Sequence, residues 1–166
     1  MQAWGVRFYR NIDSIYKTFY NKSFAVKNKN INLLGGKTMC SKQKFFICKH
    51  CGNLIGLIEN KGIPMVCCGE KMTELVANTT EASVEKHLPV VTVAGDRIEV
   101  DIGSAPHPME EAHHIDFIYV ETERGGQRKC LKVGEAPKAT FSFVDDKPVA
   151  VFAYCNLHGL WKTEVE

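Results

Sequence analysis

Two groups of cysteine and histidine residues have the types and spacing needed to bind metal ions. Cys48 and Cys51 form a CxxC pair, and the adjacent Cys67 and Cys68 follow after 15 intervening residues. Near the C-terminus, the stretch YCNLHGLW places Cys155 three positions before a histidine. Four thiolates complete a tetrahedral site that suits zinc or iron, and a thiolate close to an imidazole is a common ligand pair for zinc, copper and iron.

The four-cysteine group lies in a short, loop-rich segment, residues 40–76. A segment of this length cannot bury enough apolar surface to fold alone, so a metal that links its two turns is the natural source of stability. Gly52 permits a tight turn after the CxxC pair, and the adjacent Cys67–Cys68 pair predicts a distorted tetrahedral site. A disulfide within the CxxC pair and a redox-active CxxC are the alternatives. His50 is interpreted as an exposed loop residue.

The C-terminal part shows the period-two alternation of β-strands. In RIEVDI, the apolar residues Ile98, Val100 and Ile102 alternate with charged ones. Short segments of this kind follow at intervals of about ten residues, separated by Gly-, Pro- and Asp-rich turns, which predicts a mainly β, antiparallel sandwich or barrel. The predicted strands are 97–102, 115–121, 128–133, 139–144 and 148–154.

Four of the six histidines fall in loops or at the ends of these strands: His87, His107, His113 and His158. Prolines on both sides of His107 exclude a helix there. A single histidine is usually an ordinary polar residue, but four of them with one thiol in the loops of a small sheet domain indicate a metal site. Blue copper fits less well than iron, because no methionine follows Cys155. A Cys155–His158 protease pair is disfavoured, because such pairs come from distant segments.

Composition excludes several classes of protein. No run of about 18 apolar residues exists, so no membrane-spanning helix is predicted. Seven cysteines, an odd number, without a signal-peptide pattern favour metal binding in a reducing compartment, and we expect a cytoplasmic protein. Residues 39–166 carry 14 basic and 18 acidic side chains, a balance of −4, so nucleic acid is not an expected partner.

Residues 1–38 differ from the rest, with seven Lys or Arg side chains and Asp13 as the one acid. An organelle transit segment, a basic arm, or a stretch upstream of a true start at Met39 would each fit this composition. We favour the last interpretation, because LGGK can be encoded by a purine-rich ribosome-binding sequence. In each case we expect a poorly ordered leader without chemistry of its own.

The four cysteines, together with EKHLPV (85–90), PHPMEEAHH (106–114) and YCNLHGLW (154–161), resemble desulfoferrodoxin, the two-iron form of superoxide reductase, over residues 39–166. The resemblance implies a rubredoxin- or desulforedoxin-like domain at 39–76 with an Fe(Cys)4 centre. It further implies an immunoglobulin-like β-sandwich at 77–166 with an Fe(His)4(Cys) centre. The expected cofactors are therefore two iron ions per chain.

The resemblance also implies roles for individual residues. The four equatorial nitrogens would come from the histidines at loops and strand ends, and the axial sulfur from Cys155. His114, next to a ligand position, is assigned no ligand role, and neither are Cys40 and Cys130. Cys130, in an alternating strand, is interpreted as a small core residue. The predicted ligands are Cys48, Cys51, Cys67, Cys68, His87, His107, His113, Cys155 and His158.

The implied reaction is the one-electron reduction of superoxide to hydrogen peroxide. Four neutral imidazoles and one thiolate leave ferrous iron with a net charge of +1, which attracts an anion. Lys86 would add positive potential at the mouth of the site, and Glu85 resembles the family glutamate that protects the open coordination position. A rubredoxin-like electron donor and a homodimer are the implied partners. A noncatalytic iron protein, for electron transfer or iron sensing, is the alternative.

Overall fold

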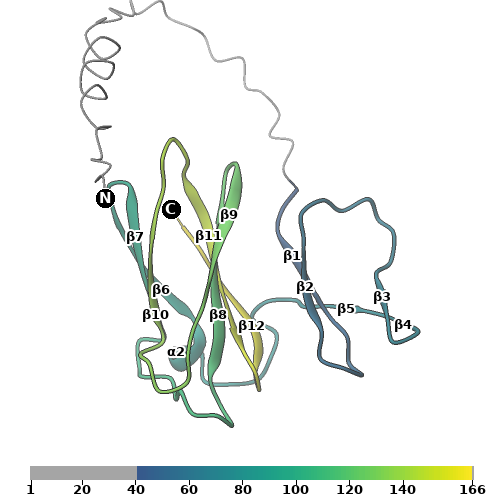
Figure 1. Ribbon diagram of the computed structural model, residues 1–166. Helices are drawn as coiled ribbons and strands as arrows, with labels where there is room; N and C mark the ends of the chain where they lie inside the picture. The colour runs from purple at the N-terminus through teal and green to yellow at the C-terminus, as the bar shows by residue number, and fades with distance from the viewer. Residues whose placement is uncertain (1–40, 166) are drawn as a thin grey trace, which may run out of the picture. The chain divides into compact units, whose positions relative to one another are not determined.

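The computed structural model describes residues 41–165, in which short β-strands dominate (Figure 1). The predicted leader and Cys40 lie outside the described residues. The elements, in chain order, are β1 (Lys44–Ile47), β2 (Leu54–Leu57), β3 (Val66–Cys67), β4 (Glu70–Lys71), β5 (Thr73–Glu74), α2 (Val84–His87), β6 (Pro89–Ala94), β7 (Arg97–Ile102), β8 (Ile115–Thr122), β9 (Gly125–Cys130), β10 (Lys138–Ser142), β11 (Pro148–Cys155) and β12 (Gly159–Glu164).

The C-terminal strands form an antiparallel β-sandwich. One sheet has the order β10-β7-β6 and the other has the order β12-β11-β8-β9. In β7, exposed and buried residues alternate along the whole strand, because successive side chains of a strand point to opposite faces of the sheet. The apolar faces of both sheets enclose one core, which includes Ile98, Val100, Ile118, Val120, Phe141, Val151 and Ala153.

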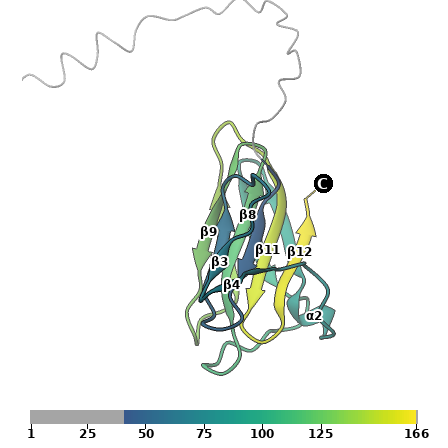
Figure 2. The same cartoon turned by 90° about the vertical axis from the view of Figure 1, so that its right-hand side faces the viewer.

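The cysteine-bearing segment forms a sheet with the order β2-β1-β5 and a small β3-β4 hairpin. Phe45, on β1, is 4% exposed and belongs to a second apolar cluster with residues of β8, β11 and β12. Its ring lies 5.7 Å from the ring of Phe117 and 5.6 Å from that of Phe152. The segment therefore packs through β1 on the outer face of the four-stranded sheet, in front of which it lies in Figure 2.

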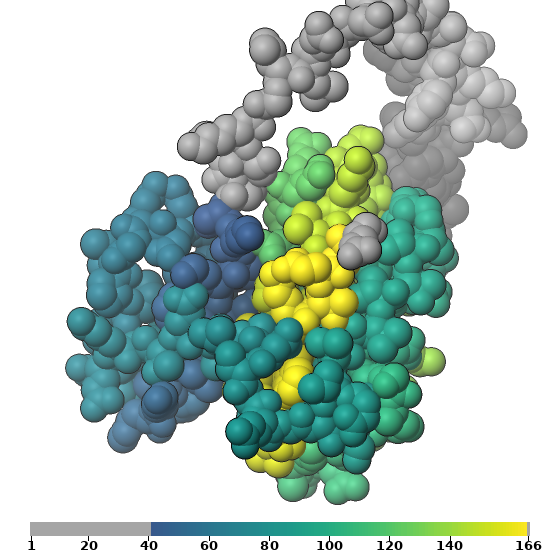
Figure 3. Space-filling view, turned by 180° about the vertical axis from the view of Figure 1, so that it is seen from behind, coloured from purple at the N-terminus to yellow at the C-terminus, as the bar shows by residue number. Residues whose placement is uncertain are grey.

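The connection from β5 to α2 crosses β12, as the space-filling view shows in teal over yellow (Figure 3). Asn78 fixes this crossing with its side-chain amide. Its Oδ1 accepts a hydrogen bond from the N–H of Lys162 (2.8 Å), and its Nδ2 donates to the carbonyl of the same residue (3.0 Å). The connection thus brings the chain to the end of the sandwich where α2 begins.

The mainly β architecture that the sequence predicts, with a small cysteine segment before an antiparallel sandwich, is confirmed. The strand predicted at 128–133 instead spans Gly125–Cys130, because the hairpin from β8 turns earlier than expected. A Cβ atom on Gly126 would lie 2.1 Å from the hydroxyl of Tyr119, so glycine permits this pairing. The interpretation of Cys130 as a core residue is wrong: β9 is an edge strand, and Cys130 is exposed.

Among residues 41–165, no helix is long and apolar enough to cross a membrane.

Replacing Phe45 by Ala should lower the free energy of unfolding by about 3 kcal/mol, because a large aromatic side chain is removed from a closed apolar cluster. Phe46→Ala is the matched control, since Phe46 is on the opposite face of β1 and is only partly buried. Phe46→Ala should lower the free energy of unfolding by less than half as much as Phe45→Ala. Urea denaturation measures the free energy of unfolding of both variants, and equal losses would contradict the assigned packing.

Candidate metal centres

The pairing of the strands brings five chemically important side chains to one end of the sandwich. β6 begins where β7 ends, with Pro89 opposite Ile102, and β8 begins where β11 ends, with Ile115 opposite Cys155. β12 begins at the same place, because Gly159 also pairs with Cys155. Residues that precede β8 and β12 therefore lie close to the last residue of β11, and the residue that precedes β6 joins them from the other sheet of the sandwich.

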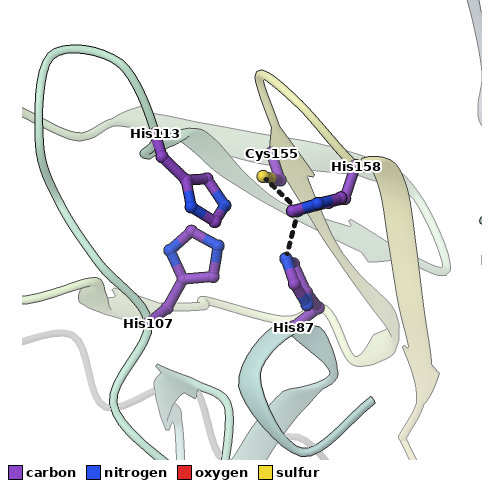
Figure 4. A group of neighbouring side chains, drawn as sticks. All are labelled: His87, His107, His113, Cys155 and His158. Atoms are coloured by element: carbon purple, nitrogen blue, oxygen red, sulfur yellow. Dashed lines mark hydrogen bonds between the residues drawn. The ribbon is translucent and has the colours of Figure 1, made fainter. Parts of the chain in front are cut away.

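Among residues 41–165, two clusters of potential metal ligands occur, and these side chains form the larger one: His87, His107, His113, Cys155 and His158, whose donor atoms all lie within 4.8 Å of one another. Figure 4 shows the four imidazoles facing a common centre, with the sulfur close to His158. The Nε2 atom of His87 is 2.9 Å from the Nδ1 atom of His158, and the Cys155 sulfur is 3.5 Å from that same Nδ1 atom.

The four imidazoles lie at the corners of an approximate square. Rings that are neighbours around it, in the order His87, His107, His113, His158, have centroids 4.6 to 4.8 Å apart. The rings of His87 and His113, at opposite corners, are 6.1 Å apart. Four nitrogen donors and a single sulfur gathered in this way are a donor set that could hold one metal ion.

Backbone carbonyls orient two of the rings. The Nδ1 atom of His87 lies 2.7 Å from the carbonyl oxygen of Ser83, and that of His107 lies 2.6 Å from the carbonyl oxygen of Pro108. A carbonyl can only accept a hydrogen bond, so Nδ1 carries the proton in both rings. The Nε2 lone pair of each ring is then free to face the centre of the cluster, as in many metal sites.

The donor atoms fit a metal ion well. The Nε2 atoms of His107 and His113 are buried and have no hydrogen-bond partner. An unpaired buried polar atom is costly, and a metal ion at the centre of the square would satisfy both nitrogens at once. Imidazole nitrogen and thiolate sulfur together suit iron or zinc.

Burial keeps the imidazoles neutral. The pKa of His107 is lowered to about 4, mainly by desolvation; the hydrogen bond to the Pro108 carbonyl opposes this effect, and repulsion by each neighbouring imidazole adds a smaller lowering. Burial also lowers the pKa of His87 and His113. The three lone pairs are therefore available for a metal ion at neutral pH, without the loss of a proton.

Cys155 is fully buried, and burial raises the pKa of its thiol. The backbone N–H groups of His158 and Leu157 oppose this effect by donating hydrogen bonds to the sulfur. A buried thiolate needs a nearby positive charge, and a metal ion is the group that supplies one here.

His114 is turned away from the cluster. Its Nε2 atom is 2.9 Å from a carboxylate oxygen of Asp116, and its Nδ1 atom is 2.9 Å from the carbonyl oxygen of Glu110. Both ring nitrogens thus have partners outside the site. Of the two adjacent histidines, the structure places His113 and not His114 with the other potential ligands, as the predicted ligand set requires.

Trp161 is a contact that the sequence reasoning missed, although it ends the YCNLHGLW stretch. Its ring is stacked on His87, with centroids 4.8 Å apart and planes inclined by 20°. Trp161 is 2% exposed, so it closes the site on the side of β12. Strand alternation from Cys155 would not reveal it, because the turn at 156–158 interrupts the alternation.

The second cluster consists of Cys48, Cys51, Cys67 and Cys68. The sulfur of Cys67 lies 3.6 Å from that of Cys51 and 3.9 Å from that of Cys68. Gly52 has a φ of 77°, as its predicted turn requires, and Cys68 itself adopts a φ of 52°. A left-handed conformation is unusual for cysteine, and here it allows adjacent residues to direct both sulfurs to the same side.

Hydrogen bonds prepare this cluster for the loss of its protons. Backbone N–H groups, that of Cys51 most strongly, lower the pKa of Cys48 to about 6, so its thiolate forms first. Hydrogen bonds shared with Cys51 and Cys67 raise the pKa of Cys68 to about 12. The four thiols therefore cannot all ionise near neutral pH without a cation, which agrees with a metal site. His50 is exposed, as expected.

Comparisons with known proteins agree with both clusters. The family model for desulfoferrodoxin matches residues 79–164. A desulfoferrodoxin from Nitratidesulfovibrio vulgaris is 40% identical over 126 residues, which cover 76% of this chain and 99% of that protein. This chain belongs to the desulfoferrodoxin family. A four-cysteine cluster and a four-histidine, one-cysteine cluster are consistent with the two iron sites of a desulfoferrodoxin.

Solved structures and shorter relatives are also similar to this chain. The crystal structure of the superoxide reductase from Treponema pallidum matches it with a TM-score of 0.64 and 34% identity, covering 75% of this chain and all of the other. A protein named superoxide reductase from Pyrococcus horikoshii is 35% identical over 100 residues, which cover 49% of this chain and 87% of that protein.

The metal-free protein should lose stability as the pH falls from about 6.5 to about 4. His107 has a pKa near 4 in the folded state and about 6.5 when unfolded, so the unfolded chain binds more protons in this window. The expected loss from His107 alone is about 3 kcal/mol. Urea denaturation across this pH range measures it. His107→Gln should give a shallower dependence, and an unchanged slope would show that His107 is not buried in its neutral form.

Proposed function

We propose that this protein reduces superoxide to hydrogen peroxide with one electron, at an iron ion held by the four histidines and Cys155. The observation that supports this most strongly is the square of imidazoles with one buried thiolate, in a member of the desulfoferrodoxin family. In the overall reaction, one superoxide takes up one electron and two protons and becomes hydrogen peroxide. The electron comes from an external donor, so no oxygen is released.

Bound iron would supply the redox step, because it passes between the ferrous and ferric states. The protein residues set the charge around it. Three of the imidazoles are held neutral by burial, and the thiolate contributes one negative charge, so a ferrous site stays net positive and attracts an anion. The backbone N–H groups of His158 and Leu157, which bond to the Cys155 sulfur, would moderate the electron density that the sulfur could donate to a bound iron ion.

We propose that Lys86 attracts the substrate and that Glu85 protects the open position of the metal. Both are exposed residues of α2, directly before the buried His87. Their charges reach the site: Lys86 lowers the pKa of His87, and Glu85 raises it. Hydrogen bonds from its own backbone N–H and from Ser83 lower the pKa of Glu85, so its carboxylate is ionised at neutral pH. An ionised carboxylate is a suitable exchangeable ligand for a ferric ion.

The backbone of α2 is fixed to the turn that follows β7. The N–H of Ala105 donates to the carbonyl of Glu85 (2.9 Å), and the hydroxyl of Ser104 donates to the same oxygen (3.3 Å). Gly103 has a φ of 81°, and a Cβ atom there would lie 2.7 Å from the carbonyl carbon and oxygen of Lys86. Only glycine permits this approach, which supports a fixed position for the backbone that bears the two charged side chains.

The remaining partners are proposed from the family resemblance. We propose a rubredoxin-like protein as the electron donor, a homodimer as the assembly and the cytoplasm as the location. The Fe(Cys)4 site in the proposed domain 39–76 would hold or pass electrons, and the proposed domain 77–166 would reduce superoxide. The packing of Phe45 on the four-stranded sheet supports a fixed relation between these two parts.

The alternative is an iron protein that transfers electrons or senses iron without turnover. Such a protein would need neither a carboxylate nor a cation next to its ligand, so the Glu85–Lys86–His87 triplet favours the enzyme. The enzyme and the noncatalytic iron protein can also be distinguished by mixing the reduced protein with superoxide.

On rapid mixing of the reduced protein with superoxide, we expect oxidation of the iron and one hydrogen peroxide for each superoxide consumed, without release of oxygen. Stopped-flow absorption with peroxide and oxygen assays measures this. Cys155→Ser should lose the reaction while the Fe(Cys)4 site remains loaded, as metal analysis would show. Iron that cycles in a redox titration but is not oxidised by superoxide would identify the noncatalytic alternative.

Replacing Lys86 by Ile should slow the second-order reaction with superoxide about tenfold at low ionic strength and flatten its dependence on salt, because one steering charge is lost. Lys147→Ile makes the same change in net charge. Lys147 precedes β11, whereas Cys155 ends it, so the control residue is a whole strand length away from the site. Equal effects of the two variants would exclude a local role for Lys86.

A further inference from the structure

The side chain of Asn156 joins the loop of Cys155 to the loop of His113. Its Oδ1 atom accepts a hydrogen bond from the backbone N–H of His114 (2.9 Å), and its Nδ2 atom donates to the backbone carbonyl of Ala112 (3.0 Å). Its own backbone N–H donates to the carbonyl of His114 (3.1 Å). The three bonds thus hold the backbone on both sides of His113 from a residue adjacent to Cys155.

This connection lies where the regular sheet pairing fails. The pairing between β11 and β8 shifts register between Tyr154 and Cys155, so the ladder does not continue regularly to the loop that bears His113. At this point the hydrogen bonds of Asn156 replace the regular backbone pairing in joining the two segments. The Oδ1 atom also lies 4.0 Å from the Cys155 sulfur, which places the amide directly beside the sulfur donor of the cluster.

His113 depends on such support more than two of the other histidines do. His87 and His107 are each oriented by a carbonyl at Nδ1. Within residues 41–165, no protein group hydrogen-bonds to a ring nitrogen of His113, and the ring is only partly buried. Its direction therefore follows from its backbone, which bonds with Glu110 on one side and is held by Asn156 on the other.

We infer that Asn156 is a positioning residue: it fixes the His113 imidazole relative to the Cys155 sulfur and so determines how strongly the sulfur can bond to the metal. The inference rests on the proposed function only in taking iron as the metal of this site. Groups that orient metal ligands without touching the metal typically change metal affinity 10- to 100-fold when they are removed.

The chain offers a matched control in Asn78. It makes the same set of bonds across β12, since Oδ1 accepts from Lys162, Nδ2 donates to the carbonyl of Lys162, and its backbone N–H donates to the carbonyl of Leu160. These bonds flank Trp161 and no metal ligand. His87, which Trp161 contacts, is held independently by the Ser83 carbonyl. Asn78 has a φ of 60°, so its replacement by Ala should disturb the fold at least as much.

The experiment compares Asn156→Ala with Asn78→Ala in the full-length, iron-loaded protein. The readout is the sulfur-to-iron absorption band of the ferric site, identified as the part of the visible spectrum that Cys155→Ser abolishes. We expect Asn156→Ala to shift this band and to lose it at a chelator concentration about 10- to 100-fold lower than the wild type. Asn78→Ala should keep the wild-type band and chelator midpoint, although urea unfolds both variants earlier.

An unshifted band and an unchanged chelator midpoint in Asn156→Ala would overturn the inference, as would the same changes in Asn78→Ala. If Asn156→Ala does not fold, as judged by circular dichroism, Asn156→Ser replaces it, because it removes the same amide while keeping a polar group. Neither readout requires superoxide. A wild-type protein that binds iron but does not reduce superoxide would therefore contradict the proposed function alone.

Discussion

The antiparallel pairing of the sandwich strands is the constraint on which the metal site depends. The five residues come from the end of a short helix, from loops and from a strand end, and, in the described part of the chain, carbonyls of nearby residues hold only the rings of His87 and His107. Pairing of Pro89 with Ile102, and of Cys155 with both Ile115 and Gly159, makes all of these ends coincide. The apolar core between the sheets fixes the registers, because a slip of one residue would turn every buried side chain toward solvent. The energy that positions the ligands therefore comes from the hydrophobic core and not from the ligands themselves.

Because the end of the sandwich holds these side chains in fixed positions, the metal-free site costs folding free energy and a bound metal ion would recover it. Burial lowers the pKa of His87, His107 and His113 and leaves the Nε2 atoms of the last two without hydrogen-bond partners. Burial likewise opposes ionisation of Cys155. A single cation removes all of these penalties together, because it accepts the lone pairs and neutralises the thiolate. The same desolvation that destabilises the metal-free protein in acid thus prepares the donors for a metal at neutral pH.

Much of this arrangement was predictable from the sequence, and the failures have physical causes. The strand at 97–102 coincides with β7, and those at 115–121 and 148–154 lie within β8 and β11, because one face of each is buried and the alternation is strong. No strand was predicted for β6 or β12: Val90 and Val93 are exposed apolar residues, and Trp161 is buried at the centre of its strand, so neither segment alternates cleanly. The potential metal ligands could be predicted because cysteine and histidine can be recognised as metal-binding residue types from the sequence alone, without a structure of the backbone. The positioning role of Asn156 could not be predicted, because it depends on a register shift between β11 and β8 and on hydrogen bonds to backbone groups more than 40 residues away in sequence.

The stretch 154–161 shows how one strand end serves two parts of the protein. Successive side chains of a strand point to opposite faces, so Tyr154 and Cys155 face different surroundings. Tyr154 packs against the cluster that contains Phe45, and its ring is stacked on Phe117 at 5.7 Å. Cys155 points the other way, into the sandwich core and the metal site. The packing of the cysteine-bearing segment and the position of the Cys155 sulfur thus depend on two successive residues of β11, which face opposite sides of the sheet. A displacement of β11 along its axis would disturb the packing of one and the coordination of the other together, which ties the two proposed iron sites to a single element of the fold.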